Sequence, residues 1–191
     1  MSQTKLVKIT EADHNVQLDL KYATPDNFTG EPVYQYAACY LRPQAEQLLI
    51  VARDLALDQG WHLRIFDAFR PSESQWKLWN HTPDPDFLCD PRRGSPHSRG
   101  VAVDLNLIDI QTGKTLDMGT GFDTFSPKSH HGNTDVSAKA QYNRLLLMGL
   151  MTTAGWDFYR NEWWHYQMFD ARQFDVLGDQ DLAKTMTSTK V

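Results

Sequence analysis

Two short segments of the chain combine residues that bind metal ions with a residue that transfers protons. The segment 95–104 reads Ser-Pro-His-Ser-Arg-Gly-Val-Ala-Val-Asp, and the segment 162–165 reads Glu-Trp-Trp-His. Together they supply His97, Asp104 and His165 for a cation and Glu162 as a spare carboxylate. Three protein ligands, an open position for water and a general base are the components of a mononuclear zinc hydrolase. The leading hypothesis is therefore metal-assisted hydrolysis.

The spacing within the first segment is compatible with one shared cation. A tight turn at residues 98–100 separates His97 from a strand that we predict at residues 101–108. Apolar and polar side chains alternate along this strand, so Asp104 points away from the apolar face and toward His97. Taken alone, the same pair could be a histidine that caps a turn and an aspartate in a surface salt bridge.

The second segment can serve the same cation only if Glu162 lies outside a strand. Residues three apart on a regular strand face opposite sides, so Glu162 must lie in the loop that enters a strand predicted at residues 163–169. His165 is then the third ligand, and Glu162 lies just beyond the ligands, where it can take a proton from water. Trp163 and Trp164 either keep the site rigid and dry or simply pack in the core.

Hydrolysis of an amide also needs a positive charge or a dipole for the developing oxyanion, and Arg70 is the best candidate for this role. It follows a strand predicted at residues 62–66 and precedes Pro71, which restricts its backbone near a loop. Its guanidinium is always charged and suits an oxyanion or a carboxylate. Position alone favours a different interpretation, a structural salt bridge with Asp67.

Whole-chain properties limit the classes of function. The chain has 191 residues, of which 41% are hydrophobic and 23% charged, and its net charge is −5. These values predict one globular domain with no basic patch for nucleic acid and no membrane-binding segment. The sequence offers no sign of a protein partner. The first residues lack the apolar run of a signal peptide, so we expect a cytoplasmic protein in which Cys39 and Cys89 are reduced thiols.

The predicted elements indicate an α+β fold. Apolar spacing predicts helices at Pro43–Asp58, 72–80 and Ala138–Thr153, and alternation predicts strands at 16–20, 62–66, 101–108 and 163–169. Residues 109–135 form a long irregular excursion of the kind that is usually functional or disordered. We expect a single domain with a largely antiparallel central sheet and helices packed on it. Its core spans about residues 14–170, and the tail from about Asp181 is flexible.

These motifs resemble the zinc D-alanyl-D-alanine dipeptidases, which belong to the larger group of zinc D,D-peptidases. Beyond the two opening segments, residues 21–30, 67–71, 117–123 and 129–131 also resemble segments of that family, in the same order. The resemblance covers roughly residues 18–168.

The resemblance implies hydrolysis of the dipeptide D-Ala-D-Ala with one zinc ion per chain. It implies His97, Asp104 and His165 as zinc ligands, Glu162 as the catalytic base and Arg70 as the group that stabilises the oxyanion. It further implies four residues at the substrate pocket: Ser95, Asp123, Tyr22 and Tyr36.

One of these pocket residues has a physical rationale and an alternative. A carboxylate such as Asp123 would balance the free ammonium group of a dipeptide, whereas the alternative is a turn cap in a glycine-rich loop. The adjacent His130 and His131 point apart on an extended chain, so we expect them to be structural or to support the site from outside.

Two alternatives to the dipeptidase remain open at the level of the sequence. One is a zinc D,D-carboxypeptidase or endopeptidase that acts on longer peptidoglycan peptides, and the other is a non-catalytic metal-binding domain of the same fold. Only 25 residues lie between Pro71 and His97, fewer than in the resistance-type members of the family. If this stretch covers the pocket, its lid is smaller than in those members. Whether the protein accepts longer substrates is therefore an open question at this stage.

Overall fold

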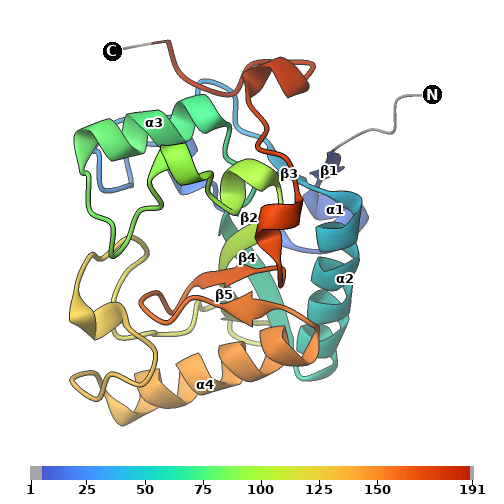
Figure 1. Ribbon diagram of the computed structural model, residues 1–191. Helices are drawn as coiled ribbons and strands as arrows, with labels where there is room; N and C mark the ends of the chain where they lie inside the picture. Colours follow the sequence, from blue (N-terminus) through green and yellow to red (C-terminus); the bar gives the residue numbers. More distant parts are fainter. Residues whose placement is uncertain (1–5, 190–191) are drawn as a thin grey trace.

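The computed structural model describes residues 6–189, in which one mixed five-stranded sheet forms the centre of the fold (Figure 1). The strands lie in the order β2 (Gln17–Leu18), β4 (Trp61–Asp67), β5 (Ala102–Asp109), β7 (His165–Gln167) and β6 (Asp157–Phe158). β2 runs parallel to β4, and the other neighbouring pairs are antiparallel. A second, two-stranded sheet pairs β1 (Val7–Ile9) with β3 (Cys39–Leu41). The predicted α+β fold with a largely antiparallel sheet is confirmed.

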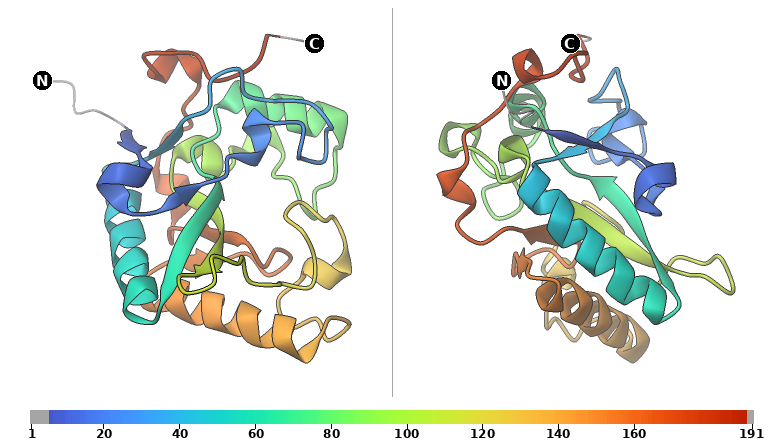
Figure 2. Two further views of the ribbon diagram at one scale, coloured as in Figure 1. Left: turned by 180° about the vertical axis from the view of Figure 1, so that it is seen from behind. Right: turned by 90° about the vertical axis from the view of Figure 1, so that its right-hand side faces the viewer.

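Two long helices cover the apolar face of the sheet and lie side by side (Figure 2). They are α2 (Pro43–Asp58) and α4 (Ala138–Thr153), and both have the predicted bounds. Pro43 stands in the first turn of α2, where a missing N–H costs nothing. The Ser137 side chain accepts a hydrogen bond from the Ala140 N–H at the start of α4. Both helices share one buried cluster with the inward-facing side chains of β4 and β5.

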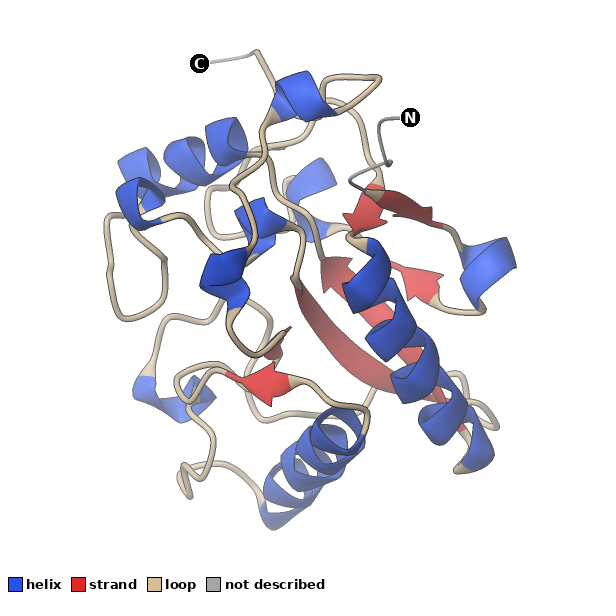
Figure 3. Cartoon of the chain, turned by 45° about the vertical axis from the view of Figure 1, so that its right-hand side comes forward, coloured by secondary structure: helices blue, strands red, loops and turns tan. Residues whose placement is uncertain are grey.

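The opposite side of the sheet carries the short helices and most of the loops (Figure 3). Helix α3 (Ser72–His81) follows β4 on this side, whereas the four-residue helix α1 (Glu11–His14), which follows β1, packs beside α2. The excursion after β5 runs to residue 137 with one short 3₁₀ turn, Pro127–Ser129, as the sequence predicts. The polar side chains of β5, including Asp104 and Asn106, are buried beneath these loops. β5 is therefore buried on both faces, and its polar side chains lie in an environment shielded from water.

Two predicted strands are shorter than expected. The strand predicted at residues 16–20 retains Gln17–Leu18, because the chain leaves the sheet after the Asp19 N–H donates to the Ile65 carbonyl. The strand predicted at 163–169 is limited to His165–Gln167, and part of the loop predicted before it is the two-residue strand β6. A hairpin therefore replaces the single closing strand, and its turn carries Glu162.

Buried residues also lie outside the range 14–170, at both ends of the described chain. At the N-terminal end, Ile9 is buried and pairs with Cys39 across the small sheet. At the C-terminal end, Met186 is fully buried and the Ser188 N–H donates to the Val33 carbonyl. Backbone pairing and one apolar anchor therefore hold the polar tail up to residue 189, and residues 190–191 lie outside the described part.

Cys39 is a buried free thiol and Cys89 a half-buried one. Among residues 6–189, the helices are too short or too polar to cross a lipid bilayer.

Candidate active site

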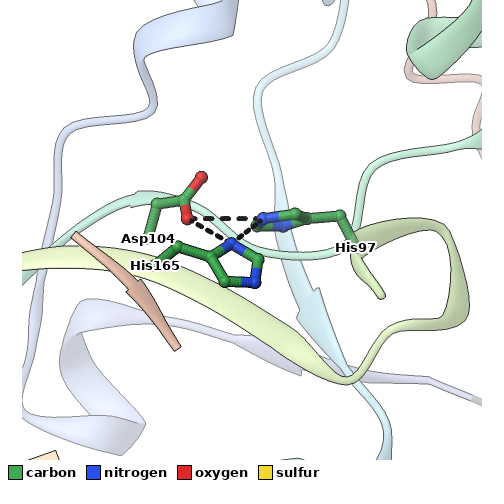
Figure 4. Close-up of side chains that lie close together, drawn as sticks. All are labelled: His97, Asp104 and His165. Carbon is green, nitrogen blue, oxygen red and sulfur yellow. Dashed lines mark hydrogen bonds and ion pairs between the residues drawn. The ribbon is translucent and has the colours of Figure 1, made fainter. Parts of the chain in front are cut away.

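The side chains of His97, Asp104 and His165 converge on one point (Figure 4). Asp104 Oδ1 lies 3.3 Å from His97 Nε2 and 3.1 Å from His165 Nδ1, and the two nitrogens are 3.1 Å apart. All three residues are buried. In a tetrahedral site with bonds of about 2.0–2.1 Å, neighbouring ligand atoms are about 3.3 Å apart. The three atoms therefore already have the spacing that one metal ion requires.

These side chains come from a tight turn and from two paired strands. His97 begins the 3₁₀ turn His97–Arg99, which ends at Gly100 with a φ of 71°. Such a positive φ suits glycine, and it returns the chain sharply into β5. Asp104 on β5 pairs directly with His165, the first residue of β7. Directly opposed residues of an antiparallel pair project on the same side, so the strand register places both at the turn that carries His97.

The outer nitrogen of each imidazole faces an acceptor oxygen, so in the neutral form of each ring the converging nitrogen carries the lone pair. His97 Nδ1 donates to the Ala68 carbonyl at 2.7 Å, and His165 Nε2 donates to Gln167 Oε1 at 3.1 Å. Each neutral ring then presents a lone pair to the carboxylate of Asp104. Two lone pairs and a carboxylate oxygen then face one point, an arrangement that a bound cation would stabilise. The donor set of two nitrogens and one oxygen fits zinc.

Glu162 lies in the turn of the β6–β7 hairpin, outside a strand, as its separation from His165 predicts. Its Oε2 lies 3.9 Å from His165 Nδ1, and the residue is 6% exposed. Burial raises the pKa of Glu162 well above its usual value, and the nearby carboxylates of Asp104 and Asp123 raise it further. A carboxylate with a raised pKa accepts a proton readily at neutral pH, which suits a general base.

Arg70 is held rigidly beside the three converging side chains. Its Nε and Nη2 bind Asp67 Oδ2 at 2.9 and 2.8 Å, and its Nη1 donates to Gln75 Oε1 at 2.8 Å. Nη2 also lies 3.7 Å from Asp104 Oδ2. The salt bridge with Asp67 that position alone favoured is thus present. A guanidinium has five N–H groups, so these bonds leave donors for a further oxygen.

A cavity of about 840 Å³ opens onto these groups. Its walls include Glu162, Arg70 and three of the four residues that we expected at a substrate pocket: Ser95, Tyr22 and Asp123. Ser95 Oγ accepts the His97 N–H at 3.2 Å, so its own hydroxyl proton is available to another acceptor.

Asp123 is a carboxylate that needs a positive partner. The Tyr22 hydroxyl donates to its Oδ2 at 2.8 Å. Burial raises the pKa of Asp123 to about 8, and the charge of Asp104 contributes in the same direction. An ammonium group in the cavity would reverse this effect and stabilise the ionised form. The contact with Tyr22 and the place in the cavity wall favour a binding role over a turn cap.

The proline-rich segment between α3 and His97 forms one wall of the cavity, through residues that include Pro85, Phe87 and Leu88. Phe87 stacks on Phe125 with ring centroids 5.0 Å apart, so the segment rests on the excursion that carries Asp123. The short stretch between Pro71 and His97 therefore borders the pocket.

Tyr36 is the one expected pocket residue that the structure does not bring to the cavity. Lys8 Nζ donates to its hydroxyl at 3.3 Å, and Lys184 Nζ lies 3.9 Å from its ring centroid. The aromatic ring is thus engaged by two lysines near the termini. A motif match places a residue on the correct loop, but it does not determine the side-chain direction.

Gln167, which no motif in the sequence singled out, also lines the cavity and bonds to His165. Residues two apart on a strand share a face, so the position of Gln167 relative to His165 was a usable signal. Asp67 was considered only as a partner of Arg70, yet its Oδ2 also lies 3.6 Å from His97 Nδ1.

Residues 2–186 match the model of the peptidase M15 family described as D-Ala-D-Ala dipeptidase. The chain belongs to this family. Membership makes it a hydrolase of a metallopeptidase family, and it confirms the resemblance that the motifs indicated.

Curated members of the M15 dipeptidase family are similar over nearly their whole length. The D-alanyl-D-alanine dipeptidase of Escherichia coli K12 is 41% identical over 177 residues, which cover 93% of this chain and 91% of that protein. The Enterococcus faecium dipeptidase is 35% identical, with 85% and 90% covered. The chain is also similar to a solved structure titled as the LdcB LD-carboxypeptidase. The TM-score is 0.47 and the sequence identity 14%, and the match covers 97% of this chain and 80% of the LdcB chain.

Proposed function

We propose that this chain is a zinc-dependent dipeptidase that hydrolyses D-Ala-D-Ala to two molecules of D-alanine. The observation that carries the proposal is the triangle of His97, Asp104 and His165 at the end of a cavity that also contains Glu162 and Arg70. Relatives at 35–41% identity that bear the name D-alanyl-D-alanine dipeptidase support the choice of substrate. The cytoplasmic location stays a prediction.

Each residue of the cavity has a defined task in this mechanism. When bound, the zinc ion supplies the positive charge that polarises a carbonyl group and makes water more acidic. Glu162 takes a proton from the attacking water and passes it to the leaving amine nitrogen. The free N–H groups of Arg70 stabilise the negative charge on the carbonyl oxygen. Asp123, oriented by Tyr22, binds the substrate's ammonium group, and Ser95 donates to a substrate oxygen.

Three substrates separate this proposal from its rivals. The zinc-loaded protein is offered D-Ala-D-Ala, L-Ala-L-Ala and a longer peptide that ends in D-Ala-D-Ala, and released alanine is measured. Cleavage of D-Ala-D-Ala alone supports the dipeptidase. Preference for the long peptide supports a carboxypeptidase or endopeptidase, and zinc binding without turnover of any substrate supports a non-catalytic metal-binding domain.

The choice of metal needs its own measurement. Metal-free protein is reconstituted with zinc, manganese or magnesium, and both the stoichiometry and the turnover are recorded. We expect one zinc ion per chain and the highest affinity for zinc among these three, because the site contains two imidazoles. An equal affinity for magnesium would contradict the assignment of zinc.

A further inference from the structure

The contact between Arg70 and Asp67 fixes only one point of the guanidinium group. Arg70 Nε and Nη2 both contact the same oxygen, Asp67 Oδ2, at 2.9 and 2.8 Å. A fork that binds two separate oxygens defines the direction of the group, whereas a single shared oxygen acts as a pivot. The second carboxylate nearby, Asp104, lies 3.7 Å from Nη2. A second point of attachment is therefore needed to keep the group aimed at one place in the cavity.

The side chain of Gln75 supplies this second point at another nitrogen of the guanidinium. Its Oε1 accepts a hydrogen bond from Arg70 Nη1 at 2.8 Å, and this bond is buried. Gln75 lies in the first turn of α3 and is 1% exposed. Helical side chains lean toward the N-terminus of their helix, so a residue in this turn reaches back to Arg70, which lies just before the helix.

The other end of the same amide group is bonded to the wall of the cavity. Gln75 Nε2 donates to the Cys89 carbonyl at 2.8 Å, and Cys89 belongs to the segment between α3 and His97 that borders the pocket. An arginine can only donate and a carbonyl oxygen can only accept, so these two partners fix which way the amide points. A carboxylate or an apolar side chain cannot make both bonds. Gln75 therefore connects Arg70 to the cavity wall through one planar group.

The amide is also neutral, which matters beside a group that must act through its positive charge. The carboxylates of Asp67 and Asp104 already lie near Arg70. A third carboxylate would neutralise more of the charge that is available to an oxyanion. The remaining contact is neutral as well, because Arg70 Cζ lies 4.8 Å from the centroid of the Tyr22 ring. Gln75 and Tyr22 thus hold the guanidinium without cancelling its charge.

We propose that Gln75 is a positioning residue that aims Arg70 at the oxygen on which negative charge develops. The inference rests on the proposed function, in which Arg70 stabilises that charge. Gln75 does not itself line the cavity, so it acts through Arg70 and through the wall at Cys89. A glutamine that only packed in the interior would affect stability, and its effect on catalysis would not depend on Arg70. This difference makes the proposal testable.

Three variants separate positioning from packing. Gln75→Met removes both hydrogen bonds and nearly preserves the size of the side chain, and it is made alone and together with Arg70→Ala. Ser74→Ala is the matched control, because Ser74 is buried in the same turn but its hydroxyl pairs with that of Thr187 at 2.8 Å. We measure kcat and KM for D-Ala-D-Ala, the Ki of a phosphinate analogue of the dipeptide, zinc content, the melting temperature, and hydrogen exchange of residues 84–93.

We expect Gln75→Met to lower kcat by about 10- to 100-fold while KM changes little, since misplacing a group that acts in the transition state costs about this much. The Ki of the phosphinate should rise by a similar factor, because its charged oxygen imitates the developing oxyanion. Zinc content should be retained, and exchange in residues 84–93 should rise. Ser74→Ala should lower the melting temperature and leave kcat unchanged.

The decisive comparison is the effect of Gln75→Met with and without Arg70. In the Arg70→Ala background it should change kcat less than twofold, because the group that Gln75 positions is gone. Equal losses in both backgrounds would overturn the proposal, as would unchanged kcat in Gln75→Met alone. If Arg70→Ala does not fold, the phosphinate decides, since a lower kcat with an unchanged Ki would also overturn it. A wild-type protein that cleaves none of the three substrates would refute the proposed function instead, and exchange in residues 84–93 would then decide whether Gln75 holds the wall.

Discussion

The proposed metal ligands and the residues around them are held by different kinds of structure. Asp104 and His165 face each other across two paired strands. His97 lies on a tight turn, and its ring contacts the Ala68 carbonyl. Glu162 and Asp123 lie outside the helices and strands, on loops. The sheet therefore positions the proposed metal ligands, whereas the loops position the proposed proton acceptor and the carboxylate proposed to bind substrate. Substitutions in the two regions should therefore affect different measurements.

The largest effect is expected from the sheet-held region. Asp104→Ala removes the only carboxylate among the three converging side chains and leaves two neutral imidazoles for the cation. We expect bound zinc to be lost on dialysis and activity to fall to the uncatalysed background, because metal affinity depends on the number of ligands. Zinc content measured by atomic emission, alongside turnover, checks this. Full zinc occupancy in the variant would mean that the ligands have been wrongly assigned.

Glu162→Gln should have the next largest effect, and it should leave zinc in place. The amide keeps the size of the side chain but cannot take a proton, so we expect kcat to fall by about 10²- to 10⁴-fold. Zinc content and the melting temperature should match those of the unaltered protein. A variant that loses zinc in proportion to activity would show that Glu162 belongs with the ligands rather than with the loop-held groups.

The loop-held region should also show a dependence of stability on pH. The pKa of His131 is lowered from 6.5 to about 4 in the folded protein. Its stabilising contribution is therefore complete above pH 6.5 and is lost as the pH falls toward 4, because the unfolded chain takes up the proton first. Relative to His131→Asn, the free energy of unfolding should decrease by about 3 kcal/mol over this range. Denaturant unfolding at several pH values measures it, and parallel curves for the two proteins would exclude a neutral buried ring.

The two ligand histidines offer a comparison within the metal site. The Ala68 carbonyl orients His97, and substitution does not remove a backbone group, whereas the Gln167 side chain orients His165. Gln167→Val should therefore weaken zinc binding by about 10- to 100-fold, which is the usual cost of losing such a partner. Competition with a chelator measures the affinity. A loss below twofold would show that the strand alone orients His165, and Gln167→Glu, which keeps an acceptor, is the matched control.

The difference between local and long-range contacts also explains how much of the structure could be predicted from the sequence. The helices at 43–58 and 138–153 are local patterns with their own start signals, and both are confirmed. Asp104, His165 and the loop position of Glu162 followed from strand alternation, which is also a local rule. By contrast, residues 129–131 contact the loop that carries Glu162, and the C-terminal tail contacts residue 33, through backbone hydrogen bonds between distant segments. Backbone groups are the same in every residue, so no side-chain pattern in the sequence reveals these contacts.

Tyr36 and Tyr22 provide the smallest and most selective test, because the resemblance implied both at the pocket and the structure brings only Tyr22 there. Tyr36→Phe removes a hydroxyl bonded to Lys8, away from the cavity, and should leave kcat/KM unchanged. Tyr22→Phe removes the donor to Asp123 and should lower kcat/KM by about tenfold, since a hydrogen bond to a charged group contributes about 1.5 kcal/mol or more. The loss should appear mainly in KM for D-Ala-D-Ala, because the carboxylate binds substrate rather than taking part in proton transfer. Equal losses in both variants would place Tyr36 at the substrate and would require the loop that carries it to move when substrate binds.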